Sequence, residues 1–358
     1  MHSSVECLNF CDLADDDRAL WNKFQAADRS LASPYFSVSY VAAVDAARPG
    51  VRVLRFSEQD RPVAYWPFRK GPFGTARPIA GPMDDLHGII AQATTRLDLN
   101  HAAIRKHIGG FAFSAVPFQQ SRHGLKGQFG AGNQVIDLIQ GFDVWLAARS
   151  AESSNFRREW RKSQKLIDAE STVIQHDVVD SGSFDRLIDL KREAYASSGH
   201  FDIFKLDWTR GLLEKLSISG DDNARGVLST LSIEGETAAI SFSMRSHTAL
   251  HYWFPAYEAS YAKQKPGLAL LFTLAKWAAQ EGIQELHLGL GDTQYKRQMA
   301  SWMMPVRGGA FALSPVQRCA TCFTNWGHRT EGQSKLSTIA AKSARKYERT
   351  ALSGSWRA

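Results

Sequence analysis

The chain of 358 residues is long enough for two domains of ordinary size, each with its own hydrophobic core. Hydrophobic residues make up 44% and charged residues 22% of the sequence, a balance that excludes an intrinsically disordered chain. The net charge of +7 suits an anionic ligand, but it is equally compatible with weak attraction to nucleic acid or to a membrane surface.

The sequence contains no run of about 18 apolar residues, so it predicts no transmembrane helix. An acidic run, Asp15 to Asp17, lies where a secretory signal would need an apolar stretch. The sparse cysteines favour a reducing compartment, and we expect a cytoplasmic protein. Cys319 and Cys322 have the spacing of a metal-binding pair, but a tetrahedral zinc site needs four ligands and no second pair follows. The sequence therefore predicts no metal site.

One order of elements occurs twice along the chain. Residues 18–26 carry Leu20, Trp21 and Phe24 on one helical stripe, and a predicted hairpin follows at 51–56 and 62–68. Residues 184–196 carry a second such stripe, which includes Leu187, Ile188, Leu190, Ala194 and Tyr195, and a hairpin follows at 226–233 and 237–244. The repetition predicts two modules of similar design, with boundaries at 1–150 and 151–328.

Two basic segments lie at the start of the second module and directly after it. Residues 153–166 predict a helix that begins at Ser and Asn caps and carries many Arg and Lys residues. Two interpretations of this helix stay open: a solvated linker, or a cationic wall beside an anionic substrate. Residues 329–358 form a basic tail for which we expect one amphipathic helix.

The segment 247–296 carries the strongest functional signal. It predicts a buried strand at 251–254 that ends at Pro255, a polar loop, a helix that begins near Pro266, and a strand at 285–290. The helix opens with the pattern Gln264-x-x-Gly267-x-Ala269. A helix N-terminus offers unpaired N–H donors and the positive end of the macrodipole, and glycine admits a phosphate close to the backbone. Lys263 and Lys265 add positive charge there, so the pattern predicts a pyrophosphate site.

This order of strand, loop, helix and strand resembles the acyl-CoA site of the GNAT acetyltransferase superfamily. Several motifs extend the likeness to CelD-like proteins of cellulose and exopolysaccharide synthesis, which are related to the FemAB aminoacyltransferases. These motifs are His251-Tyr-Trp-Phe-Pro-Ala-Tyr257, Lys265-Pro-Gly267, Leu288-Gly-Leu-Gly-Asp292-Thr-Gln-Tyr295-Lys296, Ser33-Pro-Tyr-Phe36 and Asn155-Phe-Arg-Arg158. The resemblance implies an α/β (α+β) fold of two tandem GNAT-like modules, each a mixed, largely antiparallel sheet flanked by helices. It also implies a degenerate first module and an acyl-CoA site in the second.

Roles for individual residues follow from this chemistry, in which an acceptor attacks a thioester directly. Such a reaction needs a base, an acid for the departing thiolate and donors for the oxyanion. The candidate acid is Tyr295, and the candidates for the other roles are Asp292, Lys296, His251 and Glu193, although each has an ordinary structural explanation too. The residues expected to bind acyl-CoA are Phe254, Gln264, Lys265, Gly267, Leu268 and Ala269.

Three functions remain open at this point. The leading one is acyl-CoA-dependent N- or O-acyl transfer to a sugar, nucleotide-sugar or polysaccharide precursor. The second is aminoacyl transfer from aminoacyl-tRNA, which the basic helix favours. The third is a non-catalytic scaffold of a polysaccharide-synthesis complex. We expect acetyl-CoA or another acyl-CoA as co-substrate, a small-molecule or glycan acceptor, and no DNA partner. The resemblance also suggests peripheral association with a membrane-bound polysaccharide synthase at the inner membrane face.

Overall fold

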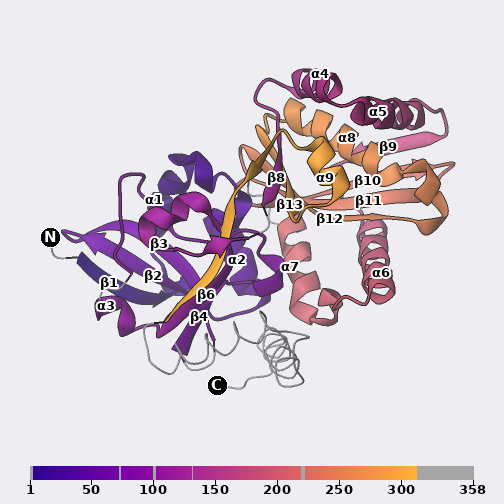
Figure 1. Cartoon of the computed structure of the whole chain (residues 1–358). Coiled ribbons are helices and arrows are strands. Elements are labelled where there is room, and N and C mark those ends of the chain that lie inside the picture. The colour runs from indigo at the N-terminus through magenta and orange to yellow at the C-terminus, as the bar shows by residue number, and fades with distance from the viewer. Residues whose placement is uncertain (1–2, 72–73, 100–101, 131, 219–221, 313–358) are drawn as a thin grey trace, which may run out of the picture. The chain divides into compact units, whose positions relative to one another are not determined.

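A computed structural model describes residues 3–71, 74–99, 102–130, 132–218 and 222–312 (Figure 1). Among these residues the chain divides into two compact units. Unit 1 contains residues up to 28, residues 48–130 and the segment from 306, and unit 2 contains residues 29–47 and 131–305.

The units are therefore interleaved along the chain. The sequence predicted contiguous modules at 1–150 and 151–328, but the segments 29–47 and 131–150 lie in unit 2, and the segment from 306 lies in unit 1. The difference has a physical reason: a short apolar strand carries no local signal for the sheet in which it finds its hydrogen-bond partner. The tail at 329–358 and the pair Cys319 and Cys322 lie outside the described residues.

Unit 1 is built on a mixed sheet with the order β1-β2-β3-β4-β6-β15-β7, in which β5 pairs with β3. Its strands are β1 (Ser3–Asn9), β2 (Val51–Glu58), β3 (Arg61–Lys70), β4 (Thr75–Arg77), β5 (Ile90–Ala91), β6 (Gly110–Pro117), β7 (Gln128–Phe129) and β15 (Val306–Ala312). Its helices are α1 (Asp15–Ala26) and the short α3 (Ala102–Arg105).

Strand β3 separates two packed layers in unit 1. Tyr65 stacks on Trp21 of α1 with ring centroids 5.3 Å apart, as the helical stripe at 18–26 predicted. The next residue, Trp66, points to the opposite face and packs edge-to-face on Phe111 of β6, at 4.6 Å. This alternation follows from the two-residue period of a strand and buries both rings almost completely.

Unit 2 is built on a second mixed sheet, with the order β14-β8-β13-β12-β11-β10-β9. Its strands are β8 (Asn133–Asp137), β9 (Thr172–His176), β10 (Arg225–Ile233), β11 (Glu236–Arg245), β12 (Ala249–Tyr257), β13 (Glu285–Leu290) and β14 (Trp302–Met304). Its helices are α2 (Val38–Ala47), α4 (Phe142–Glu152), α5 (Ser154–Ile167), α6 (Ser181–Ser198), α7 (Asp207–Ile218), α8 (Pro266–Gln280) and α9 (Gln294–Met299).

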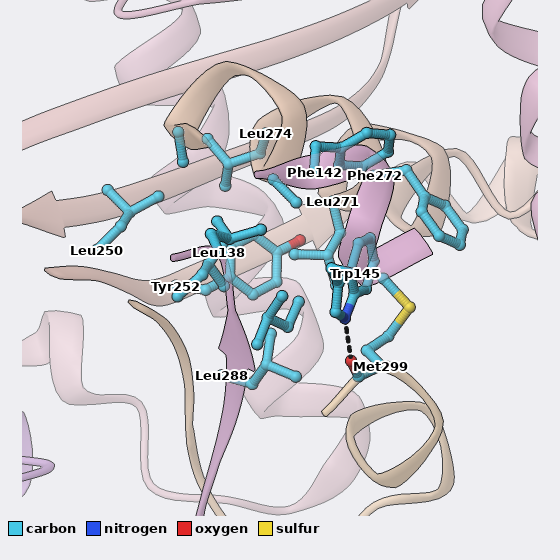
Figure 2. Close-up of a cluster of buried hydrophobic side chains, with 14 of the residues drawn as sticks. Leu138, Phe142, Trp145, Leu250, Tyr252, Leu271, Phe272, Leu274, Leu288 and Met299 are labelled. Atoms are coloured by element: carbon cyan, nitrogen blue, oxygen red, sulfur yellow. Dashed lines mark hydrogen bonds between the residues drawn. The ribbon is translucent and has the colours of Figure 1, made fainter. Parts of the chain in front are cut away.

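Helices cover both faces of the second sheet. Helices α4, α5 and α8 lie over one face, and α6 and α7 lie over the other (Figure 1). On the first face, Phe272 of α8 packs against Trp145 and Phe156, and the Trp145 Nε1–H donates to the Met299 carbonyl at 3.1 Å. Figure 2 shows this cluster, with Tyr252 lying among aliphatic side chains.

These two helix-flanked, mixed and largely antiparallel sheets confirm the predicted fold class. Both hairpins are present, as β2–β3 and β10–β11, and the predicted helices correspond to α1, α5, α6 and α8. Two details were wrong. Ala194 is exposed on α6, and Pro255 lies inside β12 instead of ending it. No helix among the described residues is long and apolar enough to cross a membrane.

Candidate functional site

The distinctive feature of unit 2 is a pair of parallel strands that separate. Strands β12 and β13 pair at Ala249–Glu285, Leu250–Leu286 and His251–His287, and this ladder extends no further. Beyond this ladder, β12 continues to Tyr257 and pairs only with β11, and β13 pairs only with β8. Among the described residues, one edge of β12 therefore has no strand partner from residue 252 onward. This edge also explains why Pro255 is tolerated within the strand, since a proline N has no proton to donate.

Two local irregularities produce the separation. In β12, Phe254 lies opposite Phe242 and Tyr252 lies opposite Ser243, so Trp253 is an extra residue in a bulge. In β13, the register shifts between His287 and Leu290, where Gly289 has φ of +79°. Glycine adopts this conformation without the steric cost that a Cβ brings. Bulges bend strands and redirect side chains, so each irregularity bends its strand where the ladder ends.

Helix α8 begins just after the end of β12. Its N-cap is Lys265, whose backbone is left-handed at φ 55° and ψ 49°. The N–H groups of Leu268 and Ala269 both donate to the Lys265 carbonyl, at 3.0 and 3.3 Å. The remaining N–H groups of the first helical turn have no carbonyl partner within the helix. Pro266 has no N–H, so the unpartnered donor of this turn is the N–H of Gly267.

Space is available beside this donor. A Cβ added at Gly267 would meet only Tyr257 Cδ1, at 3.7 Å, which is ordinary van der Waals contact. The φ of Gly267 is not positive, so its backbone does not require glycine. Because glycine has no side chain, the N–H of Gly267 is left uncovered at the positive end of the α8 dipole. Such a site suits a phosphate or diphosphate.

The charge around this helix end differs from the prediction for Lys265. Its Nζ lies 2.6 Å from the Glu159 carboxylate of α5, which is almost fully buried. The positive charge of Lys265 is therefore matched by a carboxylate, and the net positive charge nearby comes from exposed residues: Lys263 and, on α5, Arg157, Arg158, Arg161, Lys162 and Lys165. Helix α5 is packed on α8 through Phe156 and Trp160, so it is part of the domain and not a free linker.

The other residues expected to bind acyl-CoA fall into two groups. Gln264 is exposed in the turn before α8, at the predicted place. Leu268 and Ala269 face the core with their side chains, so only their backbones are available to a ligand. Phe254 is redirected by the bulge towards α6 and packs on Phe204 of a 3-10 turn at Ile203–Lys205, with ring centroids 5.4 Å apart.

The Gly-Asp-x-x-Tyr-Lys motif leads from the end of β13 into α9. Tyr295 is 36% exposed, and burial of its hydroxyl raises its pKa to about 12. The pKa of the neighbouring Tyr252 is also raised. Burial is the larger cause there, and the electrostatic effect of Tyr295 is the smaller one. Lys296 Nζ donates to the carbonyl of Leu290, the last residue of β13, at 2.7 Å. Asp292 is exposed and forms an ion pair with Arg297, at 2.7 Å.

His251 and Glu193 lie apart from this motif. His251 is completely buried on β12 and packs edge-to-face on Tyr35, with ring centroids 5.0 Å apart. This position favours a packing role over contact with a ligand. Glu193 is exposed on α6 and forms an ion pair with Arg186, at 3.4 Å. Lys191 and Arg192, which adjoin Glu193 in the chain, have other partners: Lys191 contacts the Pro255 carbonyl, and Arg192 pairs with Asp202.

A buried polar network on β13 was not predicted. His287 Nε2 lies 3.1 Å from a Glu285 carboxylate oxygen, and the other oxygen accepts from Arg29 at 2.7 Å. Asn133 of β8 contacts His287 Nδ1 at 3.0 Å. Burial opposes ionisation of Glu285, but His287 and Arg29 outweigh it, so the pKa of Glu285 lies below its usual value. The signal was present as two polar residues at alternate positions of an otherwise apolar strand.

Comparisons with known proteins agree with this geometry. Residues 152–297 match the family model described as an acetyltransferase (GNAT) domain. This stretch is therefore similar to a GNAT-type acetyltransferase domain. The family implies an acyl-CoA co-substrate, and the uncovered N–H of Gly267 and the open edge of β12 fit its diphosphate and its extended amide chain.

Solved structures resemble most of the chain at low sequence identity. A structure of FemX superposes with a TM-score of 0.61 at 10% identity, and covers 90% of this chain and 99% of its own. The C-terminal domain of a putative lysylphosphatidylglycerol synthetase from Agrobacterium fabrum gives 0.53 at 10% identity, with 89% and 98% covered. A tandem GNAT protein from the clavulanic acid biosynthesis pathway gives 0.52 at 9% identity, with 88% and 99% covered. These likenesses show the tandem GNAT fold. No curated protein matches the sequence.

Proposed function

We propose that the protein is an acyl-CoA-dependent N- or O-acyltransferase that acts on a sugar, a nucleotide-sugar or a polysaccharide precursor. The observation that carries the proposal is the separation of β12 and β13 beside the N-terminus of α8. An open strand edge can pair with the amides of an extended chain, and the Gly267 N–H can bind a diphosphate. The sugar acceptor rests on the motifs that resemble CelD-like proteins.

The residues of the domain then take distinct tasks. Bound acyl-CoA would supply the thioester, which is an activated acyl group. Gly267 and the basic residues around it would hold the diphosphate, and the backbone of β12 would align the extended chain. Tyr295 has a pKa raised to about 12, so its hydroxyl holds its proton at neutral pH, and it would give that proton to the departing thiolate as the C–S bond breaks. Lys296 holds the end of β13, through the Leu290 carbonyl, next to Tyr295 in the chain.

Aminoacyl transfer from aminoacyl-tRNA is the second candidate. The exposed basic face of α5 favours it, because a row of Arg and Lys residues attracts a nucleic-acid backbone. Binding of tRNA should then fall steeply with salt, and replacement of Arg157, Arg161 and Lys165 by Glu should abolish it. Under the acyl-CoA proposal, the same replacements should weaken acetyl-CoA binding only several-fold, because they alter charge near the site and not the Gly267 donor.

Calorimetric titration with acetyl-CoA and with CoA tests the proposal. Wild-type protein should bind with a dissociation constant in the micromolar range, and Gly267→Trp should abolish binding by covering the N–H. Gly211→Trp is the matched control, because Gly211 lies on α7 with open space around it. Gly267→Ala, whose Cβ has room, should fold normally and weaken binding to an intermediate degree. If the wild-type protein binds no acyl-CoA, the proposal is wrong.

A further inference from the structure

Lys191 of α6 reaches the backbone of β12 at the strand edge described above. Its Nζ lies 3.4 Å from the Pro255 carbonyl, beyond the last β12–β13 pair at His251. The ammonium group also lies over two aromatic rings, 5.3 Å from the centroid of Tyr195 and 5.9 Å from that of Phe254. The bulge at Trp253 is what turns Phe254 towards this helix. Lys191 therefore contacts the segment of β12 that the proposed function assigns to acyl-CoA.

Lys191 has no carboxylate partner among the described residues, although carboxylates are near it in the chain and in the fold. Glu193, Glu258 and Asp202 are each held by an arginine, and Asp189 is exposed on α6. Arg186 binds both Glu193 and Glu258, and Arg192 binds Asp202. The charged groups of the elements packed around Lys191 are Asp185, Arg186, Asp189, Arg192 and Glu193 on α6, Asp202 and Lys205 at the 3-10 turn, and Glu258 after β12.

An amine in this environment is a stronger candidate for proton transfer than for a structural ion pair. Burial without a counter-ion disfavours the charged form, and it lowers the pKa of Lys191. A larger share of this side chain is therefore the neutral amine at neutral pH than for a solvated lysine. The neutral amine has a lone pair that can accept a proton, which is how enzymes obtain a basic lysine.

We propose that Lys191 is the general base that takes the proton from the acceptor's amine or hydroxyl group. This inference rests on the proposed acyl transfer. As the acceptor's N or O bonds to the acyl carbon, the C–S bond breaks, the acceptor's proton moves to the Lys191 amine, and Tyr295 gives a proton to the thiolate. Return of the proton from Lys191 to Tyr295 through solvent restores both groups, so the step balances without any further reactant.

The test is a direct titration of Lys191, which needs neither acceptor nor turnover. Lysine amines of the full chain are dimethylated with ¹³C-formaldehyde and followed by NMR against pH, and Lys191→Met identifies the signal. We expect a midpoint below that of a lysine model peptide measured alongside. Adding acetyl-CoA should shift the Lys191 signal and leave that of Lys215, which is exposed on α7, unchanged.

The outcomes separate the two proposals. An ordinary midpoint, or a Lys191 signal that bound acetyl-CoA does not move, would overturn the role of Lys191. A midpoint that rises when inorganic phosphate is added would make Lys191 an anion-binding residue and would also overturn it. If calorimetry detects no acetyl-CoA binding while the midpoint is low, it is the proposed function that fails.

Discussion

The two sheets differ most at the parallel strand pair that each contains. In unit 2, the chain leaves β12, forms the long helix α8 and returns as β13, and the helix N-terminus lies beside the strand end. In unit 1, β4 pairs in parallel with β6 at Thr75–Gly110 and Ala76–Phe111, and the described part of the connection contains only short elements, with α3 spanning Ala102–Arg105.

The connection in unit 1 is held by side chains instead of by helical hydrogen bonds. Gln120 bonds both the N–H and the carbonyl of Ile89, at 2.9 Å each, and Asp84 accepts from the Ala80 N–H at 2.8 Å. His87 accepts from the Ser114 N–H at 3.2 Å, and burial lowers its pKa to about 3, so it stays neutral. The same topology thus gives unit 2 an exposed helix N-terminus, whereas in unit 1 the connection is held by buried side-chain hydrogen bonds. This contrast favours unit 2 as the location of the proposed ligand site.

The largest expected effect comes from the ring that anchors α8. Phe272→Ala removes packing against Trp145, Phe156 and Trp160, and should lower the free energy of unfolding by about 3–5 kcal/mol. It should also weaken acetyl-CoA binding, because α8 presents the Gly267 donor. Phe111→Ala is the matched change in the core of unit 1 and should destabilise by a similar amount with no change in affinity. Denaturant unfolding and calorimetry measure both. Equal loss of affinity in the two variants would contradict the assignment of the site to unit 2.

The second effect concerns a buried carboxylate in each unit. Glu285→Gln leaves His287 and Arg29 without their partner and should destabilise by about 3 kcal/mol. Because the pKa of Glu285 is lowered in the folded state, its contribution is present above its ordinary value of 4.5 and is lost as pH falls below it. Unfolding measured from pH 7 to pH 3 should therefore show a shallower acid decline for the variant. An unchanged decline would show that the network carries little of the acid sensitivity.

The corresponding group in unit 1 is Asp17, which accepts hydrogen bonds from Arg55 and from the Tyr65 hydroxyl, at 2.7 Å each. Asp17→Asn is the companion variant, and it should destabilise to a comparable degree because it too leaves a buried arginine contact without its charge. It should have no effect on acetyl-CoA binding.

A third effect separates two tyrosines whose pKa values are both raised. Burial does this for Tyr295, and burial together with Asp17 does it for Tyr65. Tyr295→Phe should lower the rate of acyl transfer roughly 100-fold or more, since the proton donor is lost while the ring remains. Tyr65→Phe should leave the rate unchanged and cost about 1–2 kcal/mol of stability through the lost hydrogen bond to Asp17. If the protein is a scaffold without catalytic activity, Tyr295→Phe should leave its function unchanged.

The local elements were largely predictable because periodicity determines them. The stripe of Leu187, Ile188 and Leu190 predicted α6, and Pro266 and Gly282 bracketed α8 as the ends of a helix do. The motif Gln264-x-x-Gly267 predicted the helix N-terminus where the structure has it. Contacts between residues far apart in the chain could not be predicted from the sequence. Examples are the ion pair of Lys265 with Glu159 and the pairing of β15 with β6 in unit 1.

Lys191 shows why part of the site was missed. On the sequence it adjoins Glu193 and reads as half of an ion pair, but α6 turns about 100° per residue, so the two side chains diverge. Glu193 instead forms an ion pair with Arg186, and Lys191 contacts a strand edge that the bulge at Trp253 and the register shift in β13 together leave open. A bulge depends on how two strands pair, so it cannot be predicted from residues 249–257 alone.

The smallest effect compares the two hairpin turns, which have the same length but different residues. In unit 1, Gln59 and Asp60 both have positive φ, 50° and 61°, and in unit 2 Glu234 and Gly235 have 54° and 83°. A type I′ turn needs these conformations, and glycine adopts them without strain. Asp60→Gly should therefore stabilise unit 1 by about 0.5–1 kcal/mol, and Gly235→Asp should destabilise unit 2 by a similar amount. A Cβ at Gly235 would meet nothing within 4 Å, so its cost is purely conformational. Denaturant unfolding of the two reciprocal variants measures this, and shifts of the same sign would contradict it.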